Sequence, residues 1–299
     1  MNIFLLLTIA MLMIILMLRR HIPIGPCMLT SGIFIWLMKA PELPYLVQAL
    51  RETLTMPRTY DILFALYFVM CLEIELRTSG ALAGMVQALQ RIFSSAKVTL
   101  AVMPAFLGLL PSLGGARFSA PIVEEASKNL PIEQEHKAAI NFWFRHIFEF
   151  SSPIIPGMIM ACNIAGVSYG EFILHLAWLT VLAFSAGWFV LIRPIKAANS
   201  RTETIANDSQ GTQDLWLALS PVIITFILVV FCGLNASAGM GLVTACLFLV
   251  LRFTNREVGL KDVVIGALDI KMFLNVLCIL YFIQILTVTH VLQLSLIHI

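Results

Sequence analysis

Two stretches of the chain combine residues that could do chemistry with residues that interrupt helices. The first is "LGLLPSLGGARFSAPIVEEASKNL", residues 107–130, which follows an apolar run. A proline and two glycines in it stop a helix and permit a tight turn. Just beyond them, Ser119 is predicted to cap a new helix, with Pro121 in its first turn. Free N–H groups at that helix start, close to Arg117, would favour an anion.

The candidate binding residues of this turn are small, hydroxylated or basic: Ser112, Gly114, Gly115, Arg117 and Ser119. Non-helical backbone at membrane depth is tolerated only where it is buried in protein or lines a wet cavity. We therefore expect residues 98–130 to form a re-entrant hairpin whose tip faces a substrate cavity. The alternative is an ordinary cytoplasmic loop with a solvated arginine.

The second stretch is "EHKAAINFWFRHIFEFSSPIIPG", residues 135–157, in which polar residues recur every four positions. Lys137, Asn141, Arg145 and Glu149 would form one polar stripe on a helix. Two prolines and a glycine then predict a broken helix over residues 134–168, and Ser152 is predicted to cap its second half. Broken helices that point an N-terminus at the membrane midplane are a recurring feature of transporters.

This second stretch predicts a substrate site that uses Asn141, Arg145, Ser151 and Ser152. Buried charges in membranes are costly and mark functional sites by default. The alternative is an Arg145–Glu149 pair that only holds helices together.

Several groups could carry a proton or a coupling ion: Glu124, Glu125, His146 and Glu149. A histidine titrates near physiological pH, although a hydrogen-bonded packing histidine or a solvated glutamate would explain the same residues. Glu73 and Glu75 lie two positions apart and cannot share one helical face, so one of them is expected to point inward.

The composition places these motifs in a membrane protein. The 299 residues are 60% hydrophobic and 12% charged, about half the usual charged fraction, and the mean hydropathy is +0.93. The six cysteines and six histidines show no metal-ligand spacing, so no metal or cofactor is expected, and no feature points to nucleic acid. Ser119 and His146 could meet, but no acidic residue to orient the histidine is evident, so we expect no enzyme.

The fold class predicted from the apolar runs is an all-α polytopic membrane protein. The runs cover residues 2–18, 22–38, 60–76, 158–192, 215–234, 236–252 and 270–288. Residues 80–95 have one apolar face, which suits a helix lying in the membrane interface. Residues 194–214 form a long polar run that is typical of a linker between two halves.

The distribution of basic residues distinguishes two possible membrane topologies. If the N-terminus is outside and residues 98–130 re-enter on one side, 13 of the 19 basic residues face the cytoplasm, as the positive-inside rule favours. If residues 98–130 crossed the membrane, every basic loop after them would face outward. The charge distribution therefore favours the re-entrant hairpin over a crossing.

The chain resembles the uncharacterised bacterial and archaeal membrane proteins called domain of unknown function 401. The hairpin pattern of that family is matched by Pro111, Gly114, Gly115, Phe118, Ser119, Ala120, Pro121, Glu124 and Glu125. Its aromatic-Phe-Arg-His motif is matched by Trp143, Phe144, Arg145, His146 and Glu149. The resemblance covers nearly the whole chain.

That family is grouped with the ion transporter superfamily, which includes gluconate permeases, citrate transporters and arsenite pumps. The grouping implies an inverted-repeat secondary transporter and a homodimer in the cytoplasmic membrane of a bacterium or archaeon. Residues 1–193 would form the first repeat, 194–214 a cytoplasmic linker, and 215–299 the start of a second, truncated repeat. We expect 295–299 to be non-native, because "LSLIHI" resembles translated sequencing adaptor.

One departure bears on the substrate. Several dicarboxylate transporters of the superfamily carry a Ser-Asn-Thr signature at the hairpin tip, and this chain has no Asn-Thr pair there. Neither sodium nor a dicarboxylate therefore follows from the resemblance. The sequence predicts a secondary active transporter of a small anion, an organic acid, coupled to H⁺ or Na⁺. The alternatives are a cation/proton antiporter that uses membrane carboxylates and a non-transporting membrane scaffold.

Overall fold

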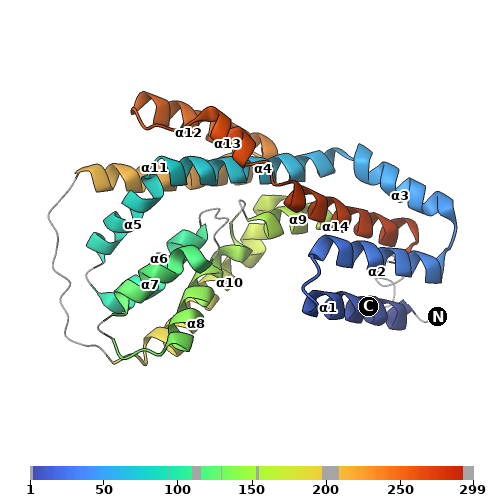
Figure 1. Cartoon of the computed structure of the whole chain (residues 1–299), viewed down its shortest axis with the longest axis horizontal. Coiled ribbons are helices and arrows are strands. Elements are labelled where there is room, and N and C mark those ends of the chain that lie inside the picture. The colour runs from blue at the N-terminus through green and yellow to red at the C-terminus, as the bar shows by residue number, and fades with distance from the viewer. Residues whose placement is uncertain are drawn as a thin grey trace. The chain divides into compact units, whose positions relative to one another are not determined.

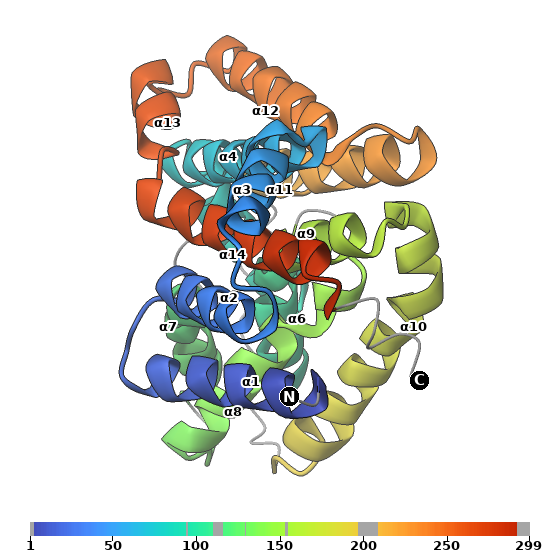
Figure 2. The same ribbon diagram turned by 90° about the vertical axis from the view of Figure 1, so that its right-hand side faces the viewer.

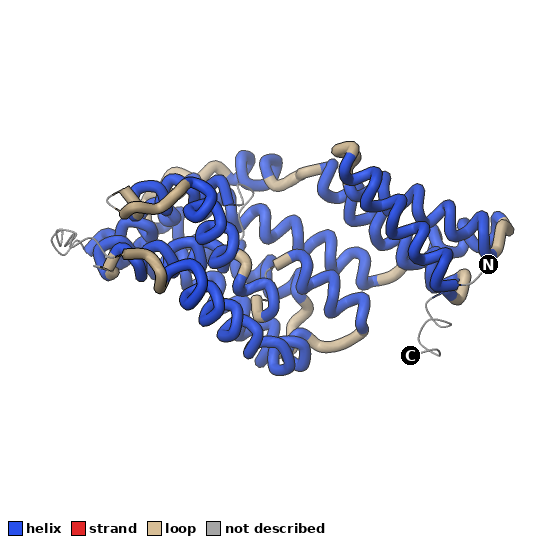
Figure 3. The backbone as a smooth tube through the Cα atoms, turned by 90° about the horizontal axis from the view of Figure 1, so that it is seen from below, coloured by secondary structure: helices blue, strands red, loops and turns tan. Residues whose placement is uncertain are grey.

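The structure is a computed structural model of the 299-residue chain, and it describes residues 3–93, 95–109, 116–128, 130–152, 155–196 and 209–291. Within these ranges the chain forms helices and no strand (Figures 1 and 3). The all-α prediction is confirmed. The chain divides into two compact units, one formed by residues 1–63 and 268–299 and the other by residues 64–267.

The first unit brings together the two ends of the sequence. It contains α1 (Ile3–Arg19), α2 (Ile24–Lys39), α3 (Leu43–Thr55) and α14 (Ile270–Val288). Helix α2 lies between α1 and α14 (Figures 1 and 2). Gly25 permits a close approach, since its backbone N–H donates to Oδ1 of Asn275 at 3.0 Å.

The second unit contains the candidate site. Its elements are the second part of α4 (Pro57–Thr78), α5 (Ala81–Ile92), α6 (Ala96–Leu109), α7 (Ala116–Ala126), α8 (Gln134–Arg145), the 3₁₀ helix η1 (Ile147–Phe150), α9 (Pro156–Ala165), α10 (Tyr169–Gly187), the π-helix η2 (Trp188–Ile192), α11 (Ser209–Phe226), the π-helix η3 (Ile227–Phe231), α12 (Ala236–Phe253) and α13 (Leu260–Gly266).

Helix α6 packs against both α7 and α8, which lie beside it in Figure 1. The shared core contains Leu100 and Ala101 of α6, Val123 of α7, and Ile140 and Phe144 of α8. The opposite side of α8 is held by α10, since the indole Nε1 of Trp143 donates to the carbonyl oxygen of Ala183 at 2.8 Å. Helix α8 is therefore fixed from two sides.

Four helical segments of the described residues are long and apolar enough to cross a membrane: Tyr169–Ile192, Gln213–Phe231, Ala236–Phe253 and Leu260–Val288. Ile3–Arg19, Ile24–Lys39 and Ala96–Leu109 are shorter apolar helices. The predicted span 60–76 does form the helix α4, but it is not among the four. Acidic residues lie near both of its ends, at Asp61, Glu73 and Glu75.

Three features differ from the sequence prediction. Helices α3 and α13 were not expected. The polar run 194–214 ends inside a helix, because α11 begins at Ser209, while residues 197–208 lie outside the described part. Helix α5 has its predicted apolar face, yet that face includes buried Met85 and Leu89, and α5 packs on α11. The expected interfacial helix is thus covered by protein.

Candidate functional site

The polar stripe of α8 faces the hairpin helix α7. The Nζ of Lys137 lies 2.8 Å from Oε1 of Glu124. One turn further along α8, the hydroxyl of Ser119 donates to Oδ1 of Asn141 at 2.5 Å. The α8 residues ascend in number while their α7 partners descend, so the two helices run antiparallel. The stripe therefore joins the broken helix to the hairpin and is not a solvated face.

Arg145 is the third residue of the stripe and the last residue of α8. It is only 7% exposed, and its backbone carbonyl lies against Gly108 of α6, where an added Cβ would overlap the carbonyl oxygen. The carboxyl group of Glu73 interacts electrostatically with the guanidinium. Among the described residues, Nη1 of Arg145 has no hydrogen-bond partner. A buried donor is therefore available at this point.

Gly108, which contacts the Arg145 carbonyl, comes shortly before the predicted hairpin tip in the sequence. Ser112, Gly114 and Gly115 lie outside the described residues, and Arg117 is described only as a backbone position in the first turn of α7. The structure therefore brings together Ser119, Asn141 and Arg145 from the predicted site.

Both predicted helix caps are wrong. Helix α7 begins at Ala116, so Ser119 and Pro121 lie inside it, and the Ser119 hydroxyl bonds Asn141 instead. Helix α9 begins at Pro156, with Ile155 at its N-cap position. Ser152 is buried, and its hydroxyl has no partner among the described residues. Ser151 lies 2.8 Å from the hydroxyl of Thr180.

The expected pairing of Arg145 with Glu149 is also wrong. The α-helical register ends at Arg145, and the following turn η1 is a 3₁₀ helix, in which residues three apart lie above one another. Glu149 therefore meets His146, with Oε1 2.5 Å from Nδ1. The His146 ring also packs against Phe142, with centroids 4.5 Å apart. This pair is half exposed.

The two glutamates of α7 are at the surface. The hydrogen bond from Lys137 holds the pKa of the Glu124 carboxyl below its ordinary value. Glu125 lies 3.7 Å from Lys128, and both side chains are exposed. The environment of Glu124 therefore does not favour proton uptake near neutral pH, because a nearby cation stabilises the ionised carboxylate.

Sequence reasoning left the carboxylates of α4 out of the candidate site and expected only one of them to point inward. All residues from Val69 to Leu76 are buried, including Glu73 at 5% exposed and Glu75 at 1%. Their two-residue spacing predicted that only one would point inward. Because α4 is enclosed on all sides here, both are inside. The signal for both being buried is that two acidic residues lie within one apolar run.

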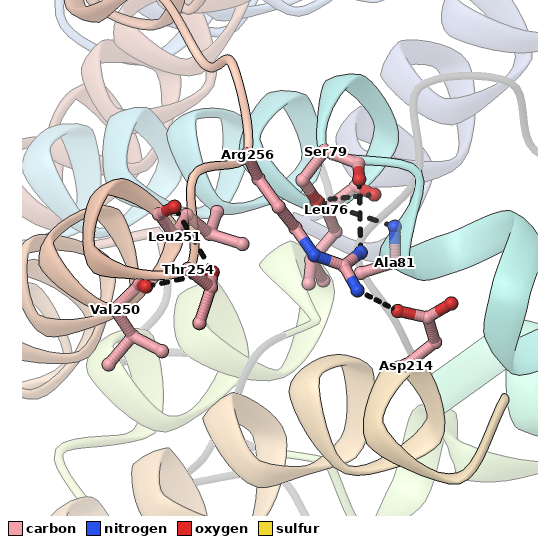
Figure 4. Close-up of polar contacts among 8 residues, drawn as sticks. All are labelled: Leu76, Ser79, Ala81, Asp214, Val250, Leu251, Thr254 and Arg256. Carbon is pink, nitrogen blue, oxygen red and sulfur yellow. Dashed lines mark hydrogen bonds and ion pairs between the residues drawn. The ribbon is translucent and has the colours of Figure 1, made fainter. Parts of the chain in front are cut away.

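A second polar cluster joins four elements of the same unit (Figure 4). Nη1 of Arg256, between α12 and α13, donates to the carbonyl oxygen of Ser79 at 3.1 Å, and Nη2 pairs with Asp214 of α11. Gly84 of α5 lies against the Asp214 carboxylate, which occupies the space a Cβ would take. The Arg256 guanidinium and the Asp214 carboxylate both have partners here, so we interpret the cluster as structural.

The fold and the buried charges define an all-helical protein with four candidate membrane-spanning helices. The comparison with protein families goes further: the family described as "Protein of unknown function (DUF401)" matches residues 2–293. The chain belongs to this family, as its motifs predicted. No curated protein matches the chain.

Proposed function

We propose that the protein is a secondary active transporter of a small anion, an organic acid, coupled to H⁺ or Na⁺. The observation that carries this proposal is the buried guanidinium of Arg145, whose Nη1 has no hydrogen-bond partner among the described residues. Leaving a buried charged donor unsatisfied is costly, and carboxylates satisfy guanidinium donors with strong, charge-assisted bonds. The carboxylate of an organic acid would accept a hydrogen bond from Nη1 of Arg145.

The surroundings of Arg145 support a transport site. Helices α6 and α7 pack as a pair, and Gly108, near the end of α6, contacts the carbonyl of Arg145, where α8 ends. Such paired interruptions lie at the substrate sites of many transporters. The helix N-termini that would face an anion are those at Ala116 and Pro156, not those predicted after Ser119 and Ser152.

The same proposal includes the wider setting expected from the sequence. Residues 98–130 would re-enter from the cytoplasmic side, the N-terminus would lie outside, and the chain would form one part of an inverted repeat. A homodimer in the cytoplasmic membrane would complete the assembly. The positive-inside count and the motif resemblance support these points.

A second candidate function is cation/proton exchange. The observation that favours it is the burial of two carboxylates, Glu73 and Glu75, inside the unit that holds Arg145. Exchangers of this kind would use those groups in place of the exposed Glu124, Glu125 and Glu149.

The test is ligand stabilisation of the full chain in lipid nanodiscs. Sodium salts of acetate, lactate, gluconate and citrate are compared with sodium chloride at equal ionic strength. Ligand at a hundred times its Kd adds about 2.7 kcal/mol to the stability of the folded state, so a bound acid raises the melting temperature. We expect one of these acids to stabilise the wild type and Arg252→Gln, a matched change at an exposed arginine, but not Arg145→Gln.

An equal rise in the melting temperature of Arg145→Gln and of the wild type would contradict the proposed site. No response of the wild type to any of the four acids would favour cation exchange. Uptake of the labelled stabilising acid into proteoliposomes, driven by a pH or sodium gradient, then tests transport itself.

A further inference from the structure

Glu75 has the most enclosed ionisable side chain of α4. It is 1% exposed and lies between Ile74 and Leu76, which are also buried. Its Oε2 has no hydrogen-bond partner, and the carboxyl group makes no ion pair with any described residue. The carboxyl group is thus buried, and no cation of the described residues pairs with it.

Glu73, two residues earlier, is in a different situation. Its Oε1 lies 3.8 Å from Nε of Arg77, and its carboxyl group interacts with the guanidinium of Arg145. Two cations therefore stabilise its negative charge. The two buried glutamates are distinguished by their partners and not by their burial.

No described residue forms an ion pair with Glu75. On α4 itself, the titratable neighbour is the thiol of Cys71, one turn earlier, which interacts electrostatically with it. Helix α12 meets α4 through Thr244 and Gly241 at Phe68. Helix α13 meets it through Gly266 at Ile74 and through the Tyr67 hydroxyl, which donates to the carbonyl oxygen of Val264 at 3.2 Å. These contacts are apolar or hydroxylic.

The protonation state of a buried carboxyl group depends on whether a cation or a hydrogen-bond donor lies beside it. An isolated carboxylate in an apolar interior is so unfavourable that the group takes up a proton instead. A neutral carboxyl group can also donate one hydrogen bond. A hard divalent cation, by contrast, needs six or more oxygen ligands, and the described residues hold no group of three or more potential metal ligands.

We propose that Glu75 is the proton-binding group of the protein and holds a proton at neutral pH, so that H⁺ is the coupling ion. The coupling role rests on the proposed transport function, whereas the proton binding does not. In this arrangement Arg145 meets the anion, Glu73 balances part of its charge, and Glu75 releases its proton only when water or a cation reaches it.

Infrared spectroscopy of the full chain in lipid nanodiscs tests the proton directly. We expect the carbonyl band of a protonated carboxyl group in an apolar environment at pH 7. The band should be lost in Glu75→Gln and kept in Glu73→Gln, the matched buried control. A wild type without the band at pH 7 would overturn the proposal, and so would a band that survives in folded Glu75→Gln. The wild-type spectrum decides the first point even if the variant does not fold.

Proton movement tests the coupling. Proteoliposomes that contain a pH-sensitive dye receive a gradient of gluconate, and counterflow of labelled gluconate is measured in parallel. In the wild type and in Glu257→Gln, a change at an exposed loop position, protons should move with the anion without sodium. Proton movement should stop in Glu75→Gln. Continued proton movement in that variant, with anion flux, would overturn the inference and leave the transport function standing.

A wild type that moves no gluconate and none of the other three acids would count against the proposed function. The infrared band would then decide the proton site by itself. The two failures are therefore distinguishable.

Discussion

Arg256 pairs with Asp214, forty-two residues away in the sequence, and the same guanidinium also binds the carbonyl oxygen of Ser79. The pair is partly buried and joins the start of α11 to the loop after α12. In the topology proposed above, these segments face the cytoplasm. The arrangement fixes the end of α4, the helix that carries both buried glutamates.

Replacing this arginine should destabilise the fold. In Arg256→Gln the Asp214 carboxylate loses its ion pair, and hydrogen bonds to charged groups contribute about 1.5–3 kcal/mol each. We expect a lower melting temperature in nanodiscs, whereas Arg252→Gln, on an exposed side chain, should change it little. If both variants had the same melting temperature as the wild type, the pair would have no stabilising role. Asp214→Asn should lower the melting temperature less in the Arg256→Gln background than it does in the wild type.

Gly108 should not tolerate a side chain. A Cβ there would overlap the Arg145 carbonyl oxygen, and overpacking of a close contact costs about 1–3 kcal/mol. Gly108→Ala should therefore lower the melting temperature and weaken anion stabilisation, since Arg145 would shift. Gly157→Ala is the control, because nothing lies within 4 Å of its added Cβ. Alanine there should be neutral or stabilising, by up to about 1 kcal/mol.

The hydrogen bond between Ser119 and Asn141 should couple the hairpin to the broken helix. Both side chains are buried, so removing one partner should cost about 1–3 kcal/mol. A double-mutant cycle with Ser119→Ala and Asn141→Ala measures the coupling from melting curves. Residues in contact usually show a coupling of about 0.5–3 kcal/mol. Additive effects of the two changes would mean that the contact contributes nothing.

The Lys137–Glu124 pair predicts a dependence of stability on pH. Its carboxyl pKa is lowered by the lysine, so the folded state favours the ionised form. The stabilisation is present above the ordinary glutamate pKa and is lost as the pH falls through the lowered value. Acidification should therefore destabilise the wild type more than Lys137→Gln. Equal slopes of melting temperature against pH in the two proteins would show that the exposed pair contributes too little to detect.

The sequence predicted the helices whose apolar runs are long, because run length and periodicity are local properties of the chain. It also placed the interruptions that separate α6 from α7 and α8 from α9, since proline and glycine act on their own backbone. The family followed from the same motifs and is confirmed. The polar stripe at Lys137, Asn141 and Arg145 was visible from its four-residue spacing.

Which side chains pair with one another, and which are buried, depended on the tertiary structure. The stripe's spacing predicted one face but not that Glu124 and Ser119 would meet it, because those contacts form between separate helices. The change to a 3₁₀ turn after Arg145 turned Glu149 towards His146. Periodicity assumes that a helix has an inside and an outside. Packing encloses α4 on every side, and this buries both Glu73 and Glu75.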